Sequence, residues 1–187
     1  MKTIASLAAA AMFAFAAPAF AEDAAKPQIA VVNIQQIMKD STAAKSVREQ
    51  LEGKQKAFQS DITKKEDALK KEDQELAKQK SVLSKEAFEE KARAFRNKAT
   101  DVQKEVQSKK ALLDGAFERA ISDIQKATTD IIADIAKEKG FAIAVPTSQI
   151  LYADTKLDIS AEVLEKLNKK LPKLDVKFES SKSEEKK

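Results

Sequence analysis

No feature limits the fold of this 187-residue chain more than the absence of proline between Ala43 and Lys139. The two glycines inside this stretch, Gly53 and Gly115, are isolated from each other. Proline breaks helices strongly, whereas one glycine costs a helix only about 1 kcal/mol. The stretch is therefore predicted to be helical throughout. A single rod of that length would extend about 145 Å at about 1.5 Å per residue, so a helical hairpin is the more compact arrangement.

The apolar residues of this stretch repeat with the period of a coiled coil. The first half has Ile62, Leu69, Leu76 and Leu83 at intervals of seven, with Leu51 and Phe58 continuing the stripe upstream at a shifted phase. The second half alternates spacings of four and three through Phe88, Ala92, Phe95, Ala99, Val102, Val106, Lys109 and Leu113. Phase is lost at residues 81–85, where Ser84 can cap a returning helix and Glu86 lies near its positive end. We predict an antiparallel helical hairpin, called the arm, over residues 42–135 with its turn near 81–85.

Polar side chains interrupt the predicted seam between the two helices. Lys65, Glu72 and Gln79 occupy positions where a strong coiled coil would have a second apolar row, and Lys109 interrupts the returning stripe. The sequence therefore predicts a weak, hydrated and mobile arm.

The glycines of the arm lie about equally far from its predicted turn, so they fall at almost the same height on the two helices. A paired weak point would let the arm flex, which makes Gly53 and Gly115 a candidate hinge. The alternative is that each glycine only permits close helix contact or is tolerated.

Short apolar segments flank the arm on both sides. Residues 29–34, 141–145 and 150–152 are predicted strands, and a final amphipathic helix capped by Asp158 or Ser160 is predicted to end near Pro172. The fold class is therefore mostly α with a small β part, in the order β-α-α-β-β-α. Residues 22–41 and 136–175 form the predicted body, and 176–187 a polar tail predicted to be disordered.

Three short strands make a marginal sheet whose open edges would pair with other chains. Joining the sheets of several copies into one closed body removes both problems, so we predict an oligomer whose copy number this pattern does not specify. The candidate residues for the oligomeric body are Ile29, Val31, Phe141, Ile143, Val145, Ile150 and Tyr152.

Residues 1–21 have the pattern of a secretory signal peptide, with Lys2, an apolar run over residues 4–17 and the small-residue site Ala19-Phe20-Ala21. The alternative is an uncleaved anchor, but the run is shorter than the about 20 residues that cross a bilayer. We predict cleavage after Ala21 and a mature protein in an extracytoplasmic space. Cysteine is absent, so disulfides cannot stabilise this fold.

The composition argues against several classes of function. The chain has no histidine, the commonest general base and metal ligand near neutral pH, and only three scattered glycines, too few for a phosphate-binding loop. No catalytic, cofactor or metal site is predicted. The net charge of +4 would suggest nucleic acid as a partner inside the cytoplasm. Export removes that partner and leaves acidic clients or anionic lipid surfaces.

Two segments resemble the Skp/OmpH family of chaperones. The first is Ile29-Ala30-Val31-Val32-Asn33 followed by Ile37, Ser41, Lys45, Val47 and Leu51; the second is Tyr152-Ala153-Asp154, Leu157-Asp158-Ile159-Ser160, Val163-Leu164 and Leu167-Asn168. The resemblance implies a homotrimer with a β-barrel body and three helical tentacles around a cavity. It also implies ATP-independent delivery of unfolded outer-membrane β-barrel proteins across the periplasm, with contact to lipopolysaccharide, for which no residue set can be matched.

Basic residues concentrate near the predicted tip of the arm, where residues 78–110 contain ten basic and five acidic side chains. The positive electrostatic fields of several such tips around one cavity would attract acidic clients. Salt would weaken this attraction, because charges are screened over about 8 Å at physiological ionic strength. The alternative is that these lysines only solvate a helix. Phe88 and Phe95 have the spacing of seam residues. The candidate client-contact residues are Val82, Leu83, Lys85, Lys91, Arg93, Arg96 and Lys98.

A structural coiled-coil spacer or envelope-tethering protein would have the same arm and the same export signal. This alternative predicts no client binding and a stronger, more continuous seam.

Overall fold

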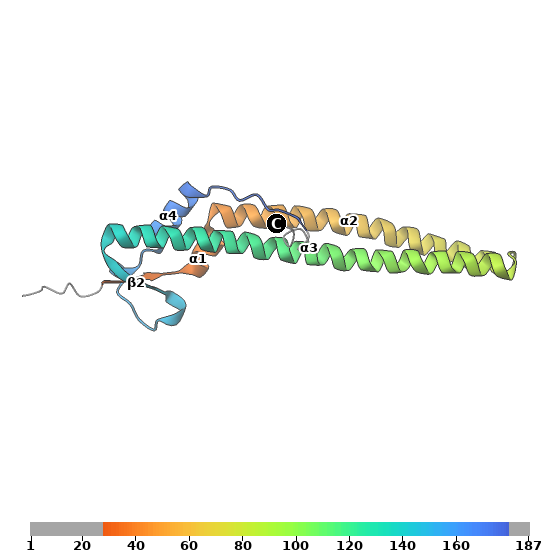
Figure 1. Cartoon of the computed structure of the whole chain (residues 1–187), viewed down its shortest axis with the longest axis horizontal. Coiled ribbons are helices and arrows are strands. Elements are labelled where there is room, and N and C mark those ends of the chain that lie inside the picture. Colours follow the sequence, from red (N-terminus) through yellow and green to blue (C-terminus); the bar gives the residue numbers. More distant parts are fainter. Residues whose placement is uncertain (1–27, 180–187) are drawn as a thin grey trace, which may run out of the picture.

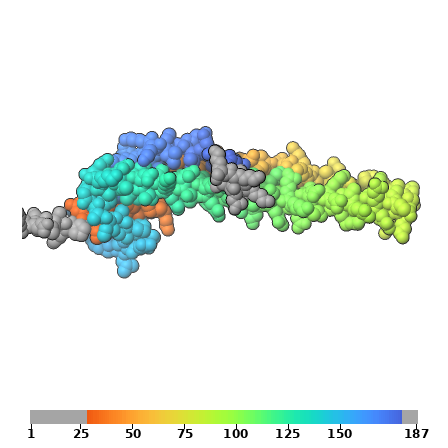
Figure 2. Space-filling view, viewed as in Figure 1, coloured from red at the N-terminus to blue at the C-terminus, as the bar shows by residue number. Residues whose placement is uncertain are grey.

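The computed structural model of the chain describes residues 28–179, so the predicted signal peptide and its cleavage site lie outside the described residues. Two long helices lie side by side and project from a small body at one end (Figure 1). The space-filling view shows the body as the broad end of the molecule and the arm as a slender projection (Figure 2). The elements are β1 Gln28–Val32, α1 Ile34–Asp40, α2 Thr42–Gln79, α3 Lys85–Lys139, β2 Phe141–Pro146, the 3-10 turns η1 Thr147–Gln149 and η2 Thr155–Leu157, and α4 Ser160–Lys170.

The arm consists of α2 and α3, which run antiparallel. They contain 38 and 55 residues, and at about 1.5 Å per residue they extend about 57 Å and about 82 Å. The turn occupies residues 80–84. Ser84 caps α3, since its Oγ accepts a hydrogen bond from the Ala87 amide at 3.3 Å, and Glu86 lies in the first turn. The predicted fold class, mostly α with a long hairpin and a small sheet, is confirmed.

The other helix ends also follow local rules. Ser41 is fully buried and caps α2 by accepting from the Ala44 amide at 3.3 Å. The Asn168 side chain of α4 accepts from the Thr42 amide at 2.9 Å, so the final helix is attached to the start of the arm. Gly140 ends α3 in the left-handed region at φ 75°, a conformation that glycine adopts without strain.

The sheet has two parallel strands, β1 and β2, with Ile29 opposite Ile143 and Val31 opposite Val145. The arm is the connection between them, as parallel strands require a long crossover. The third strand expected at 150–152 is absent from residues 28–179, so the observed order is β-α-α-α-β-α. Pro146 ends β2, η1 turns the chain, and Ile150 keeps extended angles (φ −124°, ψ 135°) with no strand beside it.

The hydrophobic core lies where the arm meets the body. Its fully buried side chains come from β1 and from all four α-helices and include Ile37, Val47, Ile124, Ile135, Val163 and Leu167. The distal arm has no such core: between residues 48 and 115 the buried side chain is Ile62 alone. Burial therefore fixes the root of the arm, and other interactions must align its distal part.

The chain after α4 turns back along α2 (Figure 1). Residues 176–179, which were predicted to begin a disordered tail, lie against the arm, and Val176 packs on the core. The prediction missed this because Leu174, Val176 and Phe178 alternate with charged residues and form an extended segment with one apolar side.

Truncating the core should destabilise the body. Leu167→Ala removes a side chain that is 0% exposed, and we expect the free energy of unfolding to fall by about 2–5 kcal/mol. Val82→Ala, at a position 79% exposed, should change it by less than about 0.5 kcal/mol. Urea unfolding at one fixed protein concentration measures both variants. Equal effects would contradict this location of the core.

Candidate functional site

Polar side chains pair across the arm at regular intervals. Lys65 Nζ lies 2.5 Å from Glu105 Oε2, and Lys98 Nζ lies 2.7 Å from Glu72 Oε1. Lys91 Nζ donates to Gln79 Oε1 at 2.7 Å, nearer the turn. The three polar positions expected to weaken the seam are therefore the positions at which the helices bond to each other. We call this set of cross-arm contacts the polar ladder.

Four charges of alternating sign form the proximal end of the ladder. Lys109 pairs with Asp61 across the arm and with Glu105 on its own helix at 2.8 Å. Lys65 also contacts Asp61, at 3.5 Å. The Lys109 side chain is 17% exposed, the least of the four. The polar interruption predicted in the returning stripe is thus a charged residue enclosed by two carboxylates.

The pKa values of this cluster shift in the directions that keep all four groups charged. Hydrogen bonds from Lys109 are the largest cause that lowers the pKa of Asp61 and of Glu105 below the ordinary values. The pKa of Lys65 is raised, first by its hydrogen bond to Glu105, and that of Lys109 first by its hydrogen bond to Asp61.

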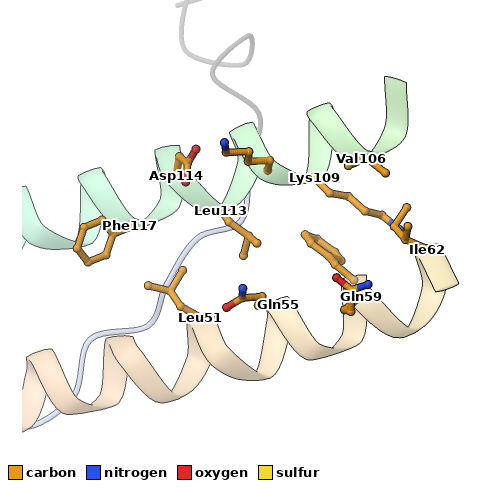
Figure 3. A pocket seen from close by; sticks show the side chains of 11 residues that line it. Leu51, Gln55, Gln59, Ile62, Val106, Lys109, Leu113, Asp114 and Phe117 are labelled. Atoms are coloured by element: carbon orange, nitrogen blue, oxygen red, sulfur yellow. The ribbon is translucent and has the colours of Figure 1, made fainter. Parts of the chain in front are cut away.

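An apolar groove opens between the helices on the body side of this cluster (Figure 3). Its volume is about 460 Å³, and Leu51 from α2 and Leu113 from α3 point toward each other across it. Two groove side chains are unusually exposed for apolar residues, Phe117 at 47% and Val106 at 40%. We call this space the arm groove; its apolar lining residues are Leu51, Phe58, Ile62, Val106, Leu113 and Phe117.

Cations surround the aromatic ring at the centre of the arm groove. Lys54 Nζ lies 5.0 Å and Lys109 Nζ 5.1 Å from the centroid of Phe58, within cation–π range. Lys110 also lines the groove. The groove is also lined by Asp114, and Lys109 is already paired with Asp61 and Glu105. Lys54 and Lys110 are therefore the cations that can meet acidic groups of a ligand whose apolar side chains enter the groove.

The groove was not predicted, because five of its apolar residues, Leu51, Phe58, Ile62, Val106 and Leu113, were assigned to the stripes of the seam. The signal was the shifted phase of the first stripe: Phe58 is followed by Ile62 after four residues, where the rest of the stripe steps by seven. A four-residue insertion into a heptad pattern locally unwinds a coiled coil. The regular seam is interrupted at this level, and side chains of both helices line a space between them.

The predicted client-contact residues all lie in the distal arm. Val82 is 79% exposed, Leu83 is half-buried, and Lys85, Arg93 and Arg96 are exposed. Lys91 and Lys98 are exposed too, but both bond to α2 as members of the polar ladder. Phe88 and Phe95 are half-buried, as expected for seam residues.

The candidate oligomer residues differ in their accessibility. Tyr152 is 86%, Ile143 50% and Ile29 44% exposed, whereas Phe141, Val145 and Ile150 are half-buried. Val31 is only 4% exposed, because its carbonyl and side chain face the segment around Asp158, so it has no surface to offer a second copy. Leu151, which was not singled out, is the most exposed large apolar residue in the described part of the chain.

The candidate hinge glycines lie within two helical backbones at nearly the same height. A side chain added at Gly53 would meet nothing within 4 Å, and one at Gly115 would meet only Arg119 Nη1 at 3.4 Å. Close helix contact therefore does not explain Gly53, although whether the arm bends there stays a prediction.

Residues 28–179 contain no cluster of three acidic, cysteine or histidine side chains arranged to hold a metal ion. In the same range, no helix combines the length and the apolar character needed to cross a membrane.

Acid should loosen the four-charge cluster. Its carboxylates, with pKa values below the ordinary 3.8 and 4.5, stabilise the arm above those values, and the contribution is lost as pH falls through the lowered values. The raised pKa of each lysine keeps its contribution intact up to at least 10.5. Spin labels on α2 and α3 should report one separation between about pH 5 and about pH 10 and a distribution that broadens only as the pH falls below 3.8.

The variant Asp61→Asn/Glu105→Gln should show the broad distribution throughout this pH range, since its lysines have lost both carboxylate partners. Glu89→Gln/Glu90→Gln, on the same helix but outside the cluster, should match the natural chain. A natural chain whose separation stays narrow in acid would contradict the role of the cluster.

Comparison with known proteins connects this architecture to a family. The family model described as outer membrane protein (OmpH-like) matches residues 28–167. Among solved structures, the chain is similar to a Caulobacter crescentus CB15 protein described as an OmpH-like outer membrane chaperone, with TM-score 0.76 and 18% identity over 82% of this chain and 90% of that one. At that identity the likeness shows the fold alone. No curated protein matches the chain. The family resemblance read from the sequence is confirmed, and this chain belongs to the OmpH-like family.

Proposed function

We propose that this chain is an ATP-independent holdase that binds unfolded outer-membrane β-barrel proteins between its arms and prevents their aggregation in the periplasm. Family membership supports the chaperone role. The observation that supports client binding by this chain is the arm groove, which leaves Phe117 and Val106 partly exposed in a space that Lys109 and Lys110 also line.

Client capture combines two kinds of weak contact. The basic tip, with Lys85, Arg93 and Arg96 exposed, attracts acidic segments at a distance. The arm groove and Val82 then offer apolar surface. Because each contact is small and exchangeable, the client is held in solution and leaves without nucleotide hydrolysis. The same basic tip is a candidate contact for anionic lipid or lipopolysaccharide.

The body is proposed to join copies of the chain, with a homotrimer as the state that the family resemblance implies. The outer edge of β2 has no neighbouring strand in the described chain, and Leu151 and Tyr152, in the segment that follows β2, are 108% and 86% exposed. Pairing of edges between copies would cover this surface. Cleavage after Ala21 and a periplasmic location complete this proposal.

A structural spacer is the second candidate, and one observation favours it. The polar ladder makes the seam more continuous than the sequence indicated, and a spacer needs a continuous seam. The two candidates differ in client binding, which a spacer does not require.

The holdase proposal predicts that the mature protein keeps a urea-denatured outer-membrane β-barrel protein soluble after dilution, without ATP and best at low salt. Light scattering measures the aggregation. Scattering that is the same with and without the chain would remove the proposal and leave the spacer.

The arm groove can be tested in the same assay. Phe117→Ala removes an aromatic contact worth about 2 kcal/mol, so client affinity should fall about thirtyfold. Val106→Ala, inside the groove, should weaken binding more than Val102→Ala, the same change one helical turn outside it. Equal affinities for the last two variants would place client contact elsewhere.

The hinge proposal predicts opposite effects on stability and motion. Gly53→Ala meets no steric obstacle and should stabilise the helix by up to about 1 kcal/mol. If the arm bends at this level, amide hydrogen exchange in residues 50–57 should slow much more than in residues 64–71. Uniform slowing along α2 would mean that Gly53 is merely tolerated.

A further inference from the structure

The C-terminal segment of the described chain, residues 173–179, binds to the arm in a strand-like manner. Leu174, Val176 and Phe178 are half-buried, whereas the four residues that alternate with them are exposed. This period of two is that of a strand with one covered side. The segment lies beyond residue 167, where the match to the family ends.

The polar contacts that the arm makes to this segment are directed at its backbone. The Gln50 side chain donates from Nε2 to the Leu174 carbonyl at 2.7 Å and accepts from the Val176 amide at 3.0 Å. Arg119 Nη2 donates to the carbonyls of Lys177 at 3.3 Å and Glu179 at 2.9 Å. Gln50 therefore acts as a strand edge would, and none of these bonds depends on the identity of the bound side chains.

The surface below the segment combines small apolar side chains with polar ones, among them Arg119 and Asp123 of α3. Ala116 and Ala120 of α3 are 1% and 4% exposed with the segment in place, and together with Leu174 and Val176 they line a hollow of about 550 Å³. At its far end, Lys54 Nζ lies 5.4 Å from the ring centroid of Phe178 and also faces Phe58 of the arm groove. Within residues 28–179, no ion pair joins the segment to the arm.

We propose that this strand-docking surface, formed by Gln50, Lys54, Ala116, Arg119 and Ala120, binds extended client segments in which apolar side chains alternate with polar ones, and that residues 173–179 occupy it as an internal competitor. The inference rests on the proposed holdase function and deepens it. Transmembrane β-strands have this alternation, so unfolded barrel proteins contain many segments of the required kind. Backbone-directed bonds let one surface accept all of them.

The competitor sets a threshold for binding. A segment tethered by a short linker acts at an effective concentration that is roughly millimolar, so a single weak client segment would not displace it. A long client that brings many alternating segments near the arm would displace residues 173–179. The surface is thereby covered when no unfolded barrel protein is present.

Two full-length variants distinguish the contribution of the arm-facing side chains of the segment from that of its exposed side chains. Val176→Ser/Phe178→Ser removes side chains that face the arm and should release the segment; Asp175→Ser/Lys177→Ser changes exposed ones and should not. The probe is a fluorescein-labelled decapeptide in which valine alternates with serine and lysine, compared with a decapeptide of the same composition whose valines form one block. Fluorescence anisotropy measures binding.

The released variant should bind the alternating peptide at least about tenfold more tightly than the natural chain or the control variant. Adding Gln50→Ala to it should abolish this gain, and the block peptide should show none. Equal binding by natural and released chains, or equal binding of both peptides, would overturn the proposal. If that happened while the natural chain still kept a denatured barrel protein soluble, the holdase function would stand and only the docking surface would fall.

A measurement on the natural chain avoids any folding defect of the variants. Saturating alternating peptide should speed hydrogen exchange of the Val176 amide, because displacement breaks its bond to Gln50. The Ala44 amide, bonded to Ser41 in the body, should exchange at an unchanged rate. Unchanged exchange at Val176 under saturation would also overturn the proposal.

Discussion

The distal arm depends on a single register between two helices that have little apolar surface to bury against each other. Individually exposed ion pairs contribute little to stability, yet Lys65, Glu72 and Gln79 reach partners on α3 only in this alignment. A slip of one residue would rotate a partner by about 100° around its helix and turn its charge away. The ladder therefore selects the alignment, while the capped turn at Ser84 and the core at the root fix the two ends between which it forms.

The same register explains why the groove lies where it does. The heptad stripe on α2 steps by four between Phe58 and Ile62, so the pattern of a left-handed supercoil is interrupted there, and the arm groove lies at this level. The four-charge cluster closes the distal side of this opening, since Lys109 pairs with Asp61 and also faces Phe58. Neighbouring residues of one seam thus align α2 with α3 and leave the apolar surface of the arm groove exposed.

Local signals in the sequence were sufficient to predict the helices of the arm, but not to predict which residues of the two helices contact each other. The cap at Ser84 and the stop at Gly140 each act within one turn of backbone, and the absence of proline acts at each residue of the stretch separately. The hairpin could therefore be predicted from local signals. The ladder, the groove and the docked segment depend on which residues meet across the arm, and Gln50 and Arg119 carry no local mark of that role. The prediction of a strand at residues 150–152 was wrong for a related reason. The local composition favours a strand, but no neighbouring strand is present beside this segment in the described chain.

The partial burial of the groove also bears on how a client could leave. Phe117 is 47% exposed, so covering the remainder of its ring removes about 100 Å² from water and contributes about 2 kcal/mol. One such contact corresponds to an affinity far weaker than millimolar, whereas several contacts on the arms of the proposed oligomer would add through their high effective concentration. Because each contact opens separately, a client held in this way would exchange one segment at a time. Folding of a released client segment elsewhere would then be enough to release the rest of the client.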